Sequence, residues 1–121
     1  MINCLLIGIG GFIGSVFRYW MGFLPVRLES GFPVATLLIN VIGAAVIGLI
    51  AALAAKSSSL NEHLVLFLKV GLCGGFTTFS TFSLETTALI QNGSVGVAVC
   101  YVALSVILCV AAVFGMQLLV R

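Results

Sequence analysis

The residues with the most evident chemistry lie in the segment GGFTTFSTFS, at positions 74–83, which mixes glycine, phenylalanine and hydroxyl side chains. Gly74 and Gly75 each lower helix stability by about 1 kcal/mol relative to alanine, and the threonines that follow Phe76 compete for backbone hydrogen bonds. A membrane helix interrupted here would release carbonyl oxygens, which suit a cation. The N-terminal amides of a helix that resumes near Thr78 would suit an anion.

The phenylalanines of this segment, Phe76, Phe79 and Phe82, recur every three residues. On an intact helix they would form one stripe, whose ordinary role is helix packing. Aromatic rings also have positive edges, so rings turned edge-on toward a path would attract a small anion without a full positive charge that would trap it. Hydroxyl donors and the amide of Asn40 would then replace the hydration that the anion loses.

Other polar side chains fall inside apolar runs, where they are expensive and often functional. Asn40 and Thr36 share a helix face at a spacing of four residues. The amide either bonds across a helix interface to hold a bundle together or faces a ligand, and both roles remain open. Tyr101 and Ser105 have the same spacing, which on its own is more often structural than functional.

Charged residues are rare within these runs. Glu85, four residues after Thr81, is the only acid inside one, so we expect it to be paired or exposed to water in a vestibule. Arg18 lies beside aromatic residues and is interpreted as an anchor that reaches the membrane surface. Gly10 and Gly14 have the spacing of a close helix–helix contact.

The composition sets the class of protein that must position these side chains. The chain has 121 residues, of which 62% are hydrophobic and 7% charged, whereas soluble domains have about a quarter charged residues. This is the composition of an integral membrane protein. The net charge of +2, without a basic cluster, does not suit nucleic acid. Neither a nucleophile–base pair nor a metal-ligand cluster is visible, so an enzyme is the least favoured class.

Four apolar runs are long enough to cross a bilayer, which takes about 20 helical residues. They cover approximately residues 2–24, 34–55, 63–90 and 95–120. The connections are short, so the whole chain forms a single transmembrane domain with nothing outside the membrane large enough for catalysis. We therefore predict an all-α membrane protein of four transmembrane helices, with a break in the third.

The basic residues give only a weak signal for orientation. Three of the five lie toward the end that holds the N-terminus, and two lie toward the other. This bias permits insertion both ways and hence an antiparallel dimer. A bundle of this size is too small to enclose a generous aqueous path alone, and the chain shows no internal repeat, so we expect a homo-oligomer.

Three motifs resemble the signatures of the CrcB/Fluc family of fluoride channels. They are GGFIGSVFRYW at positions 10–20, TLLINVIG at 36–43 and GLCGGFTTFSTFSLE at 71–85, and the third is the most specific. They occur in the family's order, and the resemblance covers essentially the whole chain. One departure is Ala35, where many members have glycine. It concerns packing more than chemistry.

The resemblance implies an antiparallel dual-topology homodimer that exports fluoride passively through two narrow pores. The membrane would be the plasma membrane of a prokaryote, which is the inner membrane in a Gram-negative cell. Backbone carbonyls at the positions matching Gly74 and Thr77 would hold a structural sodium ion at the dimer centre. The positions that match the fluoride path or its vestibule are Phe79, Phe82, Asn40, Tyr101, Ser105, Thr36, Thr81 and Glu85.

Two other classes share some of these features. A small proton-coupled multidrug exporter also has four helices and can adopt dual topology, but it needs a carboxylate embedded in an early span. The first two runs here contain no Asp or Glu. A structural or assembly subunit would leave the predicted helix break and the buried polar residues without a purpose.

Overall fold

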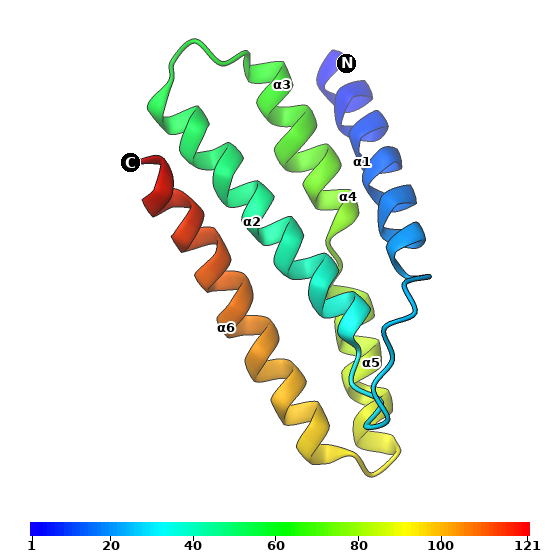
Figure 1. The fold of residues 1–121 in the computed structure, drawn as a ribbon. Coiled ribbons are helices and arrows are strands. Elements are labelled where there is room, and N and C mark those ends of the chain that lie inside the picture. Colours follow the sequence, from blue (N-terminus) through cyan, green and yellow to red (C-terminus); the bar gives the residue numbers. More distant parts are fainter.

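The computed structural model describes residues 1–121, and almost all of them are helical (Figure 1). Four helical stretches are long and apolar enough to cross a membrane, which confirms that part of the predicted fold. Three of them are the single helices α1 (Ile2–Met21), α2 (Val34–Lys56) and α6 (Val95–Val120). The remaining stretch, Glu62–Gln91, is composite.

The composite third span contains a break, as predicted. It runs through α3 (Glu62–Leu66), the π-helical segment η1 (Phe67–Cys73) and the short α4 (Gly74–Phe76), and it resumes as α5 (Phe79–Gln91). The bounds of these segments are set by backbone hydrogen bonding, and only the two threonines between α4 and α5 leave the helix.

The break lies at the threonines rather than at the glycine pair. Gly74 keeps helical angles, with φ −62° and ψ −39°. Thr77 and Thr78 are extended, with ψ values of 157° and 113°, as suits β-branched residues. The break therefore divides the phenylalanines, because Phe76 ends α4 while Phe79 begins α5, so the three rings do not form one continuous stripe.

Two helix pairs dominate the packing. α1 lies against η1 and α4 of the broken span, whereas α6 lies along α2 (Figure 1). The N-terminus, the α2–α3 linker and the C-terminus lie at one end of the bundle. The α1–α2 loop, residues 22–33, and the α5–α6 turn lie at the other end. The break therefore lies near the middle of the bundle's length.

Glycines allow α1 to approach the broken span closely. A Cβ atom on Gly10 would lie 2.7 Å from the carbonyl oxygen of Phe67 and 2.9 Å from the amide nitrogen of Leu72. A Cβ atom on Gly14 would likewise overlap the backbone at Leu72 and Phe76. These contacts confirm close packing at the spacing of Gly10 and Gly14.

Little of the chain is buried within one subunit. Only 14 of 121 residues are buried, and large apolar side chains are exposed along every span. In a protein that crosses a membrane, lipid or another protein chain covers such a surface. The few buried polar residues, Thr36, Thr78 and Ser105, stand out against it.

Candidate functional site

The site begins at the break, where an amide from α2 replaces the lost helical hydrogen bonds. Asn40 Nδ2 donates to the carbonyl oxygen of Thr78 at 3.1 Å, and the Thr78 N–H donates to Asn40 Oδ1 at 2.8 Å. Of the two roles left open for Asn40, the structure shows the bonding one. The second N–H of the amide has no acceptor in the chain, so the side chain keeps one donor for a ligand.

Thr78 also begins the helix that follows the break. Its Oγ1 accepts from the Thr81 N–H at 3.1 Å and donates to Thr81 Oγ1 at 3.0 Å. A threonine with extended backbone before a helix is a preferred N-cap. Thr78 is thus a site residue that the positions matched to the family did not include. The sequence held a signal for it, because threonine is a preferred cap for the N–H three residues later, here that of Thr81.

Three carbonyl oxygens at the break accept no hydrogen bond. The Thr77 N–H and hydroxyl both donate to the carbonyl of Cys73, at 3.0 and 2.9 Å, and the Ser15 hydroxyl reaches the carbonyl of Gly75 at 3.5 Å. The carbonyls of Gly74, Phe76 and Thr77 remain free. Hard cations take oxygen ligands, so the two positions predicted to hold sodium have the donor atoms that it requires.

The N-terminus of α5 offers the opposite charge. The N–H groups of Phe79 and Ser80 have no acceptor in the chain, as is usual for the first turn of a helix. Such groups carry a partial positive charge. The break therefore presents free acceptors on one side and free donors on the other.

A second polar group, further along α5, surrounds Glu85. Its Oε1 accepts from the Thr36 hydroxyl at 2.7 Å, and its Oε2 accepts from the Tyr101 hydroxyl at 2.7 Å. No cation lies within ion-pairing distance of this carboxylate. The expectation that Glu85 is paired is met by hydroxyl groups rather than by a positive charge.

The aromatic rings form a chain that starts at the same tyrosine. Tyr101 is fully buried and lies between Phe32, 5.4 Å away at 79°, and Phe82, 5.1 Å away at 51°. Phe79 lies 5.4 Å from Phe82 and is 80% exposed. Phe32 belongs to the α1–α2 loop, and nothing in its spacing indicated this contact.

Ser105 lies one turn after Tyr101 on α6 and points into the protein without a partner. Its Oγ is the buried side-chain polar atom that has no hydrogen bond. Buried hydroxyl groups in native proteins are nearly always bonded to protein, water or a ligand. The structure thus offers this group for a water molecule or an ion.

The structure brings the predicted residues together in two neighbouring groups on α2, α5 and α6. Asn40 and Thr81 lie at the break. Thr36, Glu85, Tyr101 and Phe82 form the second group, with Ser105 on the face of α6 that Tyr101 occupies. Phe79 is largely exposed on the outside of the subunit, with its ring next to that of Phe82.

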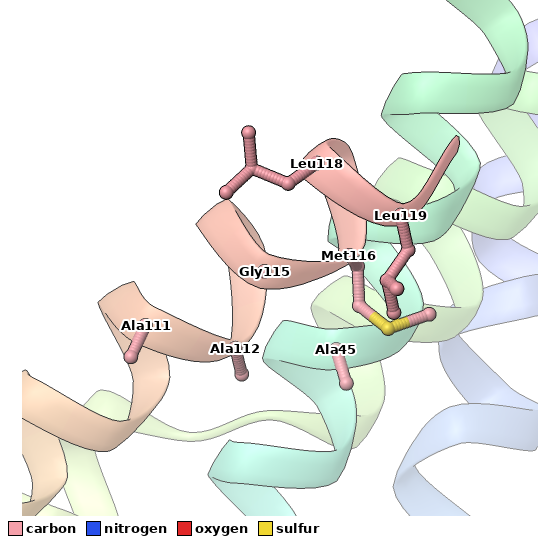
Figure 2. A pocket seen from close by; sticks show the side chains of 7 residues that line it. All are labelled: Ala45, Ala111, Ala112, Gly115, Met116, Leu118 and Leu119. Atoms are coloured by element: carbon pink, nitrogen blue, oxygen red, sulfur yellow. The ribbon is translucent and has the colours of Figure 1, made fainter. Parts of the chain in front are cut away.

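Two cavities differ in their suitability for an ion. One, of about 480 Å³, lies between α2 and α6 and is lined by Ala45, Ala111, Ala112, Gly115, Met116, Leu118 and Leu119 (Figure 2). It has no polar side chain to bind an ion. Another, of about 270 Å³, lies under the α1–α2 loop and reaches Thr36 and Glu85. The second cavity connects with the polar group.

The fold and the site define the class of protein. It is a small multi-pass membrane protein in which a broken helix, an amide and a hydroxyl-bound carboxylate gather polar groups within an apolar bundle. The profile of the family described as "CrcB-like protein, Camphor Resistance (CrcB)" matches residues 5–116. The chain belongs to this family.

Relatives of known name are similar over nearly the whole chain. A "Fluoride-specific ion channel FluC" of Ruminiclostridium cellulolyticum is 46% identical over 114 residues, which cover 93% of this chain and 88% of that protein. The protein of the same name from Agrobacterium fabrum is 44% identical and covers 95% and 93%. That of Caulobacter sp. strain K31 is 44% identical and covers 100% and 96%. The resemblance stated from the motifs is confirmed.

Proposed function

We propose that this protein is a fluoride-selective ion channel, not an enzyme, that lowers cytoplasmic fluoride by passive export. The observation that carries the proposal is a series of hydrogen-bond donors inside an apolar bundle. Asn40 and Ser105 each have a donor without a partner, and the Tyr101 hydroxyl could exchange its present acceptor, Glu85, for an anion. Relatives 44–46% identical over most of the chain have the name of a fluoride-specific channel. Small bacterial channel relatives also support the plasma membrane as its location, the inner membrane in a Gram-negative cell.

The fluoride path follows the two polar groups. Fluoride is small and strongly hydrated, so a path needs several donors that replace water without holding the ion too firmly. The free N–H of Asn40 and the unpartnered hydroxyl of Ser105 supply such donors. The side chains that line the path or its vestibule are Phe79, Phe82, Asn40, Tyr101, Ser105, Thr36, Thr81 and Glu85.

The working assembly is an antiparallel homodimer of dual topology. Phe79 is 80% exposed near the middle of the bundle, and Gly74, before the break, is exposed as well. A second copy of this chain crossing at the break would cover both residues. The exposed apolar surface elsewhere suits lipid.

The carbonyls of Gly74 and Thr77, together with those of the second copy, would hold a structural sodium ion at the centre. Free carbonyls inside a bilayer are tolerated only when something satisfies them. When bound, the ion supplies positive charge that neutralises these oxygens and ties the two broken helices together. Within this chain, the extended backbone at Thr77 keeps its carbonyl free for that purpose.

Efflux from liposomes that hold the purified protein tests the function. We expect rapid fluoride efflux with negligible chloride efflux. Equal permeation of both anions would contradict a fluoride-selective channel. Uptake of an organic cation driven by a proton gradient would favour the multidrug exporter, a function that lacks support because α1 and α2 contain no Asp or Glu.

A further inference from the structure

The cavity of about 270 Å³ beneath the α1–α2 loop has a wall of two kinds. Its inner wall includes the Thr36 hydroxyl and the Glu85 carboxylate, which belong to the polar group described above. Its outer wall consists of loop residues, among them Arg27 and Phe32. The cavity therefore links the loop at the membrane surface with the end of the polar path.

Only two charged residues line this cavity. Glu85 places a carboxylate at the inner end, and Arg27 is the only cation that lines the cavity. Arg27 forms no ion pair and no hydrogen bond within the chain. Glu29, two residues further along the loop, does not line the cavity, and neither does Arg18 at the end of α1.

An anion that enters this cavity from the loop would be repelled by the negative charge of Glu85 at the inner end. Arg27 opposes that charge, because an unpaired cation in a cleft with apolar walls raises the local concentration of anions. Its guanidinium is charged at any physiological pH. It lies on an exposed loop outside the bilayer spans, so it attracts an ion without enclosing it.

We infer that this cavity is a vestibule that collects small anions and that Arg27 is the residue that attracts them. The inference rests on the proposed function for the identity of the anion, which is fluoride. The role of Arg27 is electrostatic and acts at a distance. It should therefore weaken with salt, because the Debye length falls from about 30 Å at 0.01 M to about 3 Å at 1 M ionic strength.

The first test measures fluoride efflux from liposomes at ionic strengths of about 0.01 M and about 1 M. Arg27→Gln should lower the flux by about two- to fivefold at low ionic strength and leave it unchanged at high ionic strength. Arg27→Lys should behave as the unaltered protein, and Arg27→Glu should lower the flux further than Arg27→Gln. Glu29→Gln is the matched control in the same loop, and it should not reduce the flux.

The second test needs no fluoride transport. In an Ala35→Cys variant, the new thiol lies in the wall of the cavity, and its rates of reaction with an anionic and a cationic methanethiosulfonate reagent are compared. We expect the anionic-to-cationic rate ratio to fall by about two- to fivefold at low ionic strength when Arg27→Gln is added. The background from the four native cysteines is measured in the protein without the new thiol.

The outcomes separate this inference from the proposed function. An unchanged rate ratio, or a loss of flux equal at both ionic strengths, would overturn the inference; the latter would make Arg27 an anchor of the loop at the membrane surface. A falling rate ratio in a protein that moves no fluoride would uphold the anion-attracting cavity and refute the fluoride channel.

Discussion

At the scale of single residues, one amide holds the broken helix in place. Asn40 supplies both a donor and an acceptor to Thr78 within the apolar bundle. The same side chain keeps a free N–H beside the break. Asn40 can therefore support the break and still offer an N–H to a ligand.

Asn40→Ala should leave the N–H and the carbonyl of Thr78 without partners. Two unsatisfied backbone groups in an apolar environment should lower the free energy of unfolding by about 2–4 kcal/mol. Unfolding in mixed detergent micelles measures this change. Asn92→Ala, in the exposed α5–α6 turn, is the control; equal stability of the two variants would show that Asn40 does not support the break.

The rings next to the break should matter for transport more than for folding. Phe79→Ile or Phe82→Ile replaces an aromatic ring, with its positive edge, by an aliphatic side chain of similar bulk. We expect fluoride efflux to fall by at least about tenfold, or about 1.4 kcal/mol, with dimer assembly intact by chemical cross-linking. Phe12→Ile, at a ring 71% exposed on α1, should leave efflux unchanged. Normal efflux in both path variants would refute the role of ring edges.

At the scale of elements, α1 and the broken span are fitted together through their backbones. Gly10→Ala should therefore destabilise the protein by about 1–3 kcal/mol, because its Cβ would lie 2.7 Å from a backbone oxygen that cannot move alone. Gly8→Ala meets nothing within 4 Å and should be neutral or slightly stabilising. Detergent unfolding compares the two variants, and similar losses would mean that helix propensity rather than contact controls this face.

The elements also show what the sequence could and could not foretell. The four spans follow from the length of the apolar runs, and the break follows from glycines and threonines in one segment. Its exact position did not follow, because α4, which contains the glycine pair, stays helical where Gly75 packs against α1, whereas Thr77 and Thr78 are extended. The bonds of Glu85 joined residues on three helices, and only the fold could bring those together.

At the scale of the whole molecule, the assembly should depend on a cation at the centre. Replacing sodium by N-methyl-D-glucamine, which is too large for a site made of carbonyls, should reduce the dimer fraction or the fluoride efflux. Light scattering in detergent measures the first, and liposome efflux measures the second. Indifference of both quantities to the cation would argue against a sodium site at Gly74 and Thr77.

Because the charge bias is weak, a few added lysines should be enough to fix the orientation of the protein in the membrane. Added lysines beside Lys56 should favour one orientation, and added lysines beside Arg27 should favour the other. Each variant alone should give little fluoride efflux if the working dimer is antiparallel, and co-expression of the two should restore it. Full efflux from one singly oriented variant would indicate a parallel dimer or an active monomer.

The π-helical segment before the break has a consequence for the phase of the third span. Phe67–Cys73 contains more residues per turn than an α-helix, so this stretch carries a surplus residue relative to a regular span. Deleting one residue there should let the segment become a regular α-helix, because its wider turns already absorb the surplus residue. A one-residue deletion from a regular α-helix such as α3 would instead rotate everything beyond it by about 100° around the helix axis. The direction of the free carbonyls at the break and of the Phe79 ring should therefore survive a single deletion within Phe67–Cys73 better than a single deletion within α3.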